Sequence, residues 1–288
     1  MAQKAARTTD FHSCPQTAPI PHVGGPVTAP CDGTVLIEGL PAARFTDLAA
    51  CAGPVDAIAI GSSGCLIGNL LAARVGDAST HGGVIVAGAG EVLIGEAPGN
   101  VELIRRGNIY LIVDHTNHRI VMVGVQEYAG DGASPDYAQR AAQQINETWS
   151  GQTTYNGETY DVESHIQGRQ RETSNEANPA TNQINVAETN VPPGVHRNTD
   201  PANQHLYGRG PGYQHSNEDT DGGRTISHEF GHAMGLQDEY VEGPRGPNGE
   251  RTITRTGPEG GIMGDVSSNA RPTSDNFNSL ITGDGLAP

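Results

Sequence analysis

The sequence predicts an α+β chain of two domains, a small β-rich domain followed by a larger domain of mixed sheet and helices. An internal repeat of short apolar strands fills roughly the first third of the chain. Glycine (39) and proline (19) are abundant and aromatic residues make up only 5%, which favours turn-rich β structure over helical bundles. Two later segments show helical spacing. A chain of 288 residues can bury the cores of two such domains.

The repeat emerges when the sequence is laid over itself. The segment Leu36 to Cys51, LIEGLPAARFTDLAAC, matches Leu66 to His81, LIGNLLAARVGDASTH, at an offset of 30 residues (66 minus 36). Each copy contains a short strand, a turn, an Ala-Ala-Arg step, and an Asp followed four residues later by Cys or His. A partial copy, ARTTDFHSC, ends at Cys14, and a last strand recurs as EVLIG. Because such short strands cannot bury a face singly, we expect the copies to pack on one another.

The repeat stops near residues 97–100, where the composition shifts, and this predicts the domain boundary. Residues 1–97 form the repeat domain and residues 128–288 the second domain. Between them, residues 98–127 contain two β-rich runs around the polar turn HTNH and are predicted to form a connecting β-hairpin. The sequence leaves open which domain this hairpin joins.

The second domain is predicted to begin with an amphipathic helix at 135–149. Ser134 and Pro135 are suited to start a helix. Apolar residues then recur at three- and four-residue intervals: Tyr137, Ala141, Ala142, Ile145 and Trp149. Two predicted strands follow, TTYNGETYDVESHI and NQINVAE, with a polar surface loop between them.

Charge and cysteine usage narrow the function classes. The net charge of -16 leaves no basic stripe for phosphates, so nucleic acid and anionic membranes are poor candidate partners. No apolar run approaches the roughly 18 residues that a membrane span needs, and no signal peptide is recognisable at the start. All four cysteines lie in the first quarter of the chain, which favours metal ligation or burial over a disulfide framework.

The segment TISHEFGHAMGLQDEY carries the pattern of a zinc hydrolase. His228 and His232 are four residues apart, so on a helix both imidazoles can reach one metal ion. Zinc lowers the pKa of a bound water to about 7, and Glu229 is the predicted general base that accepts its proton. Gly235 can adopt the left-handed conformation that ends a helix, which would carry Asp238 back as the third ligand.

These residues resemble the metzincin consensus HExxHxxGxxH, in the variant with Asp as third ligand that is known from small secreted bacterial neutral proteases. The match covers eleven contiguous residues, HEFGHAMGLQD, and GGIMGDV resembles the Met-turn, with Met263 beneath the zinc site. The resemblance implies a zincin domain with a mixed sheet, a long active-site helix and a catalytic zinc. Asp238 replaces the commoner His, and a Gly/Pro-rich excursion precedes the Met-turn, so Glu239 and Glu242 remain rival ligands. Tyr240 is interpreted as a structural residue.

The repeats resemble PAAR proteins, the conical β-rich caps on the trimeric spike of type VI secretion systems and related contractile injection machines. The tetrapeptide PAAR stands at 41–44, recurs as LAAR at 71–74, and the similarity extends over roughly residues 7–96. The family binds a structural zinc near its apex with His and Cys. The repeat spacing gives this role to Cys14, Cys51 and His81, with His22 as fourth ligand, and leaves His12 as a rival to Cys14.

The remaining repeated residues are assigned structural roles. We expect Cys31 and Cys65 to be small buried side chains. Arg44 and Arg74 close the repeated step, and we expect them to hydrogen-bond to turn carbonyls rather than to bind an anion.

The two resemblances together imply an effector that is injected into a target cell, where its zinc metalloendopeptidase hydrolyses peptide bonds. The expected partners are the trimeric spike protein, a protein or peptide substrate and an immunity protein. The chain is expected in the cytoplasm of the producer before injection. Two alternatives stay open, a catalytically degenerate zincin that extends the spike and a peptidoglycan peptide amidase. The sequence leaves the natural substrate and the target compartment open.

Overall fold

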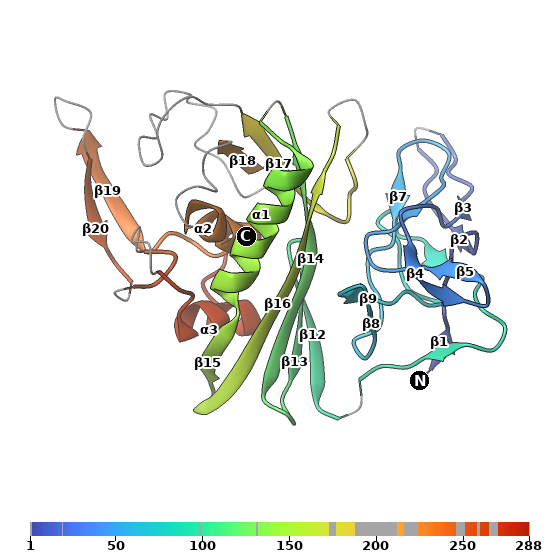
Figure 1. Cartoon of the computed structure of the whole chain (residues 1–288), viewed down its shortest axis with the longest axis horizontal. Coiled ribbons are helices and arrows are strands. Elements are labelled where there is room, and N and C mark those ends of the chain that lie inside the picture. The colour runs from blue at the N-terminus through green and yellow to red at the C-terminus, as the bar shows by residue number, and fades with distance from the viewer. Residues whose placement is uncertain are drawn as a thin grey trace.

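The computed structural model describes residues 2–18, 20–97, 99–130, 132–172, 177–187, 212–215, 224–245, 251–257, 260–264 and 270–287. Two units lie side by side, a small β unit with the N-terminus and a larger sheet covered by helices (Figure 1). The strands of the first unit are β1 (Gln3–Lys4), β2 (Phe11–Ser13), β3 (Gly25–Pro26), β4 (Asp32–Ile37), β5 (Leu40–Ala42), β6 (Leu48–Ala49), β7 (Asp56–Ala57), β8 (Leu66–Ile67), β9 (Leu70–Leu71), β10 (Val84–Ile85) and β11 (Leu93–Ile94).

Three equivalent alanines of the repeat close a ring of backbone hydrogen bonds. Ala6 donates to the carbonyl of Ala73 (2.8 Å), Ala73 to that of Ala43 (2.9 Å), and Ala43 to that of Ala6 (3.0 Å). All three side chains are buried, with at most 1% exposed. A larger side chain would not fit where three backbones approach so closely. The Ala-Ala-Arg step therefore recurs because it builds the axis on which the copies pack.

The arginine of each step forms an ion pair inside its own copy. In every copy the Arg backbone N–H and its guanidinium both reach the Asp three residues later: Arg7 with Asp10, Arg44 with Asp47, and Arg74 with Asp77. The guanidinium also pairs with a second acid from another segment, respectively Glu38, Asp32 and Glu96. The predicted structural role of Arg44 and Arg74 is confirmed, but their partners are carboxylates and not turn carbonyls, because a buried guanidinium needs a counter-charge.

The second unit is built on a mixed seven-stranded sheet. Its strands are β12 (Val101–Arg106), β13 (Ile109–Asp114), β14 (Arg119–Ala129), β15 (Gly151–Tyr155), β16 (Glu158–Gln170), β17 (Asn182–Ala187) and β18 (Gly212–His215). β13 and β14 pair antiparallel, whereas β14 is parallel to β16 on one side and to β17 beyond the end of β13. The segment 98–127 thus contributes β12, β13 and most of β14 to this sheet and belongs to the second unit.

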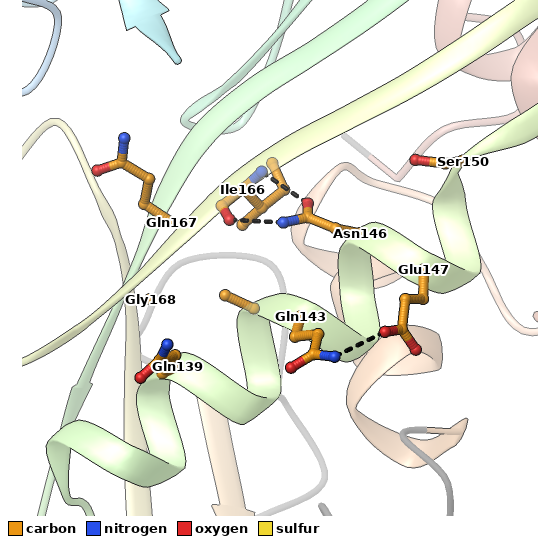
Figure 2. A pocket seen from close by; sticks show the side chains of 9 residues that line it. Gln139, Gln143, Asn146, Glu147, Ser150, Ile166, Gln167 and Gly168 are labelled. Atoms are coloured by element: carbon orange, nitrogen blue, oxygen red, sulfur yellow. Dashed lines mark hydrogen bonds between the residues drawn. The ribbon is translucent and has the colours of Figure 1, made fainter. Parts of the chain in front are cut away.

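The predicted helix at 135–149 is confirmed as α1 (Pro135–Trp149). It begins there because the Ser134 side chain accepts a hydrogen bond from the backbone N–H of Tyr137. Its apolar face packs on the sheet, and Asn146 binds the edge of β16 beyond the end of β15. The Asn146 side chain donates to the Ile166 carbonyl (2.9 Å) and accepts from the Ile166 N–H (2.7 Å), as Figure 2 shows. α1 therefore also protects an edge strand from pairing with another chain.

The first unit covers the other face of the sheet, so the two units share one apolar core. The rings of Phe45 and Tyr110 meet edge to face with centroids 5.1 Å apart. The Tyr110 hydroxyl donates to the Ala59 carbonyl (2.7 Å), and the Asn178 side chain donates to the Thr46 carbonyl (2.7 Å). β13 and β14 read as continuous apolar runs because helices cover one of their faces and the repeat unit covers the other.

The remaining elements lie on the side of the sheet opposite the repeat unit (Figure 1). They are α2 (Arg224–Ala233), the antiparallel hairpin of β19 (Tyr240–Arg245) and β20 (Arg251–Arg255), and α3 (Ser274–Thr282). α2 spans ten residues within the described part of the chain, shorter than the long active-site helix expected. In the described residues, no helix is both long and apolar enough to cross a membrane.

Candidate metal centres

α2 brings the two histidines of the HExxH pattern together. The Nε2 atoms of His228 and His232 are 3.1 Å apart, and the rings meet edge to face with centroids 4.7 Å apart. Each ring is held by its other nitrogen: His228 Nδ1 donates to the Ile262 carbonyl (2.8 Å) and His232 Nδ1 to the Leu236 carbonyl (2.7 Å). Both neutral rings therefore direct their Nε2 lone pairs at the same point. Two lone pairs this close repel each other unless a cation lies between them.

Asp238 supplies the third corner of this site. Gly235 adopts φ +94°, which ends the helix and reverses the chain as predicted. Asp238 Oδ1 then lies 3.1 Å from His228 Nε2 and 3.2 Å from His232 Nε2. A tetrahedral zinc with ligand distances of about 2.0 to 2.1 Å separates its nitrogen and oxygen donors by about 3.3 Å. The three donors therefore fit a zinc ion.

The two rival ligands do not join this group. Glu239 turns away, and its side chain accepts a hydrogen bond from Asn276 of α3 (2.7 Å). The side chain of Glu242 lies outside the described residues. Of the acidic residues considered, Asp238 is the one that the structure brings to the histidines.

The electrostatics of the site show how strongly its donors interact. Burial disfavours ionisation of Asp238, but the close contacts of its carboxylate with His228 and His232 outweigh this effect and hold its pKa below the usual range. Burial likewise disfavours the charged form of His228, yet Asp238 and the charge of Glu229 raise its pKa. The pocket thus favours positive charge among these donors.

Glu229 has a carboxylate oxygen that is available to accept a proton, as a general base requires. It is half-buried, and its Oε2 atom is buried with no hydrogen-bond partner among the described residues. An unpaired buried carboxylate oxygen is costly in a purely structural side chain. Its position beside His228 on α2 suits it to accept a proton from a water bound at the three donors.

Met263 packs directly against α2, the helix that carries His228 and His232. It is fully buried, and a Cβ atom added at Gly231 would come within 2.4 Å of its sulfur. Its carbonyl accepts from the Glu239 N–H (2.9 Å), next to Asp238, while the preceding carbonyl, that of Ile262, orients His228. The turn at Met263 therefore supports both the helix and the third-ligand segment.

Tyr240 belongs to the site, although its sequence position favoured a purely structural interpretation. Its ring stacks on His228 with centroids 6.2 Å apart and an interplanar angle of 29°. Burial, reinforced by the charges of Asp238 and Glu229, raises the pKa of Tyr240 to about 12. It is therefore a neutral phenol that can donate a hydrogen bond at neutral pH. The signal in the sequence was its spacing, two residues after the third ligand.

A second group of donors lies in the repeat unit. Its ligand atoms lie within 4.8 Å of one another and come from Cys14, His22, Cys51 and His81. The Nδ1 atoms of His22 and His81 are 3.3 Å apart, and the Cys14 sulfur is 3.8 Å from His81 Nδ1. In a tetrahedral zinc site these spacings are about 3.3 Å and 3.6 Å. Two thiolates and two imidazoles therefore fit a closed structural zinc site.

His12, the rival to Cys14, has two other partners. Its Nδ1 donates to the Gly25 carbonyl (2.9 Å), and its Nε2 lies 3.1 Å from Asp56 Oδ2. The bond to Asp56 is the main reason that the pKa of His12 is raised. Asp56 also accepts from the His81 backbone N–H (3.0 Å). His12, Cys51 and Asp56 form an overlapping group of donors, but the contacts of Asp56 with His12 and with His81 suit His12 and Asp56 to orienting the His81 ring.

The other two cysteines take no part in either group. Cys31 is 6% exposed, and burial raises its pKa to about 11, so it remains a thiol. Cys65 is half-buried, and burial raises its pKa as well. Both lie immediately before a strand, and their packing agrees with the structural role expected of them.

Comparison with known proteins finds a family match within the repeat unit. Residues 17–87 match the protein-family model described as the PAAR motif. The matched range contains His22, Cys51 and His81, and Cys14 lies three residues before it. The match supports a PAAR-repeat protein, and PAAR domains generally bind zinc. No curated protein matches the chain.

Proposed function

We propose that this PAAR-repeat protein, whose motif supports a place at the tip of a type VI secretion spike, carries a zinc metallopeptidase as its C-terminal half. In this account the first unit delivers the second into a target cell, where it hydrolyses peptide bonds. The observation that carries the enzymatic part is the triangle of His228, His232 and Asp238. Its three ligand atoms lie 3.1 to 3.2 Å apart and face one point.

An exposed apolar patch supports docking on a trimeric spike protein. Val35–Leu36 of β4 and Val92–Leu93 around β11 remain in solvent, with Leu36 60% and Leu93 58% exposed. The two strands are linked because Glu38 accepts hydrogen bonds from the N–H groups of Gly90 and Glu91. Exposed large apolar side chains on two linked strands are typical of a protein contact. Replacing both leucines with Glu is expected to abolish spike binding and leave peptidase activity unchanged.

The residues of the second unit have distinct roles in the proposed hydrolysis. A zinc ion held by His228, His232 and Asp238 would supply a Lewis acid and an acidified water. Glu229 accepts the proton of the attacking water and passes it to the leaving amine. Tyr240 donates a hydrogen bond to the oxygen on which negative charge develops. The carbonyls of Ile262 and Leu236 hold both imidazoles in the tautomer that ligates through Nε2.

The direct test is a delivery assay with Glu229→Gln, which keeps the shape of the side chain and removes the base. Susceptible neighbouring cells should survive the variant and die with the wild type, while secretion of both is equal. Glu147→Gln is a matched control, because the Glu147 side chain is exposed and accepts a hydrogen bond from Gln143 of the same helix. Toxicity retained by Glu229→Gln would refute the enzymatic account.

Purified protein identifies the substrate class. Incubation with casein and with peptidoglycan separates an endopeptidase from a peptidoglycan peptide amidase, because both use the same zinc chemistry on different scissile bonds. We expect cleavage of casein that Glu229→Gln abolishes. Cleavage of peptidoglycan peptides alone would replace the endopeptidase assignment with the amidase.

A further inference from the structure

The segment that follows α3 lies against the loop after α2. α3 ends at Thr282 with Gly283 in the left-handed conformation (φ +88°), and Gly285 adopts φ +73°. These two glycines turn the chain so that 284–287 runs against the loop after α2. Leu286 packs on the apolar core beneath this loop, which fixes the segment in place.

Two hydrogen bonds join this segment to the loop that carries the third ligand. The Ala287 N–H donates to the carbonyl of Gly235 (2.7 Å). The Gln237 side chain donates to the carbonyl of Gly285 (3.1 Å). Leu286 also lies beside Gly235, where an added Cβ would be 3.5 Å from the Leu286 Cβ. The residues on both sides of Leu236 are therefore held by one short segment.

The loop needs such support because burial does not supply it. The Asp238 side chain is 41% exposed, and Gly235 is conformationally free. Two bonds already hold the chain on either side of Asp238. Before it, the Leu236 carbonyl accepts a hydrogen bond from His232, and after it, the Glu239 N–H donates to the Met263 carbonyl. The Gly235 carbonyl belongs to the open end of a helix, where carbonyls lack partners within the helix. Ala287 provides the missing donor.

The helix α3, from which the segment 284–287 extends, is anchored on the sheet. Arg106 of β12 donates from Nε to the Leu280 carbonyl (2.7 Å) and from Nη2 to the Ile281 carbonyl (3.1 Å). A cation at this position stabilises the C-terminal end of α3. The sheet therefore holds α3, and α3 holds the segment that contacts the third-ligand loop.

We infer that 284–287 is a positioning segment that sets the place of Asp238 and thereby the metal affinity of the C-terminal site. This inference rests on the proposed function, because it assumes that Asp238 binds a metal. Residues that orient metal ligands typically change metal affinity by tenfold or more when they are removed. The effect should be confined to this site, since the four donors of the repeat unit share none of these contacts.

The test uses the full chain with Ala287→Pro, which removes the donating N–H and fixes φ, and Ala287→Gly, which retains the N–H. Cobalt(II) titration resolves the two sites, because thiolate-to-cobalt absorption arises only where Cys14 and Cys51 bind. Ala287→Pro should weaken cobalt binding at the Cys-free site by about tenfold, leave the Cys site unchanged, and leave the metal-free unfolding temperature near that of Ala287→Gly. Gln237→Ala should weaken the same site in the same direction.

The possible results separate this inference from the function on which it rests. Equal affinity of Ala287→Pro and Ala287→Gly at the Cys-free site would overturn the positioning role. If Ala287→Pro does not fold, Gln237→Ala decides, and wild-type affinity in that variant overturns the inference. A wild-type protein that binds cobalt only at the Cys site would instead refute the metallopeptidase itself.

Discussion

The indole N–H of Trp149, at the end of α1, donates to the backbone carbonyl of Ser227 in α2 (3.0 Å). Trp149 also packs edge to face on Phe230 and on Phe277 of α3. The first helix of the second unit therefore fixes the helix that begins the metal site. Because Trp149 is the sole tryptophan, its fluorescence reports on this unit.

Trp149→Phe removes this hydrogen bond and part of the ring. We expect the free energy of unfolding to fall by about 2 kcal/mol, since a buried N–H···O bond contributes about 1 kcal/mol and the lost ring volume adds a similar amount. Urea denaturation followed by circular dichroism measures the change. An unaltered midpoint would show that the contact between α1 and α2 is not stabilising.

Metal removal should expose particular cysteines. In the zinc-loaded protein we expect slow alkylation of all four thiols. After treatment with a chelator, Cys14 and Cys51 should react, because both are only half-buried and no longer hold a metal. Cys31 should remain unmodified at pH 8, since burial raises its pKa to about 11. Mass spectrometry of the alkylated peptides identifies the sites, and equal reactivity of Cys14 before and after chelation would argue against its role as a ligand.

The shared core predicts that the two units unfold together. Phe45→Ala, a substitution in the repeat unit, should lower the free energy of unfolding measured by Trp149 fluorescence in the other unit by about 3 kcal/mol. Phe11→Ala is the matched control, because Phe11 is 53% exposed and should have little effect. A Phe45→Ala protein whose Trp149 signal unfolds as in the wild type would show that the units are energetically independent.

The ion pair of Arg44 with Asp32 predicts a pH dependence. Hydrogen bonds from Thr34 and the nearby charge of Arg44 lower the pKa of Asp32, so the ionised carboxylate stabilises the fold. This stabilisation is complete above the ordinary pKa of about 4 and is lost as the pH falls through the lower folded value. Asp32→Asn should therefore cost about 2 kcal/mol at pH 7.

Thermal unfolding of Asp32→Asn and wild type across pH 3 to 7 tests this prediction. The difference in unfolding temperature should be constant at the upper end and shrink below about pH 4. Asp161→Asn, at an exposed position, should show no such trend. A difference for Asp32→Asn that does not change with pH would contradict the assigned role of the charge.

The helix α1 and the repeat could be predicted because the residues that specify them are close together in the sequence. The bounds of α1 follow from Ser134, Pro135 and an apolar spacing that only one helix face satisfies. The repeat was visible at a fixed offset, and its spacing placed Cys14, Cys51 and His81 in equivalent positions. What the repeat builds was not visible: the ring of Ala6, Ala43 and Ala73 depends on backbone contacts between copies, which no single copy encodes.

Contacts between distant segments account for the remaining differences. β13 and β14 looked like a separate hairpin because the sequence does not show that Phe45 and its neighbours cover their second face. The choice between His12 and Cys14 depends on Asp56, more than forty residues further along the chain. Tyr240 could be assigned to the site only when its ring was found against His228, because spacing alone does not fix the direction of a strand residue that follows a turn.

The measurement that tests the central claim most directly is a crystal structure of the zinc-loaded protein with anomalous diffraction at the zinc edge. We predict two peaks, one bound by Cys14, His22, Cys51 and His81, and one about 2.0 to 2.1 Å from His228 Nε2, His232 Nε2 and Asp238 Oδ1. A map with the first peak alone, and with Asp238 turned away from both imidazoles, would contradict the account of the second unit as a metallopeptidase.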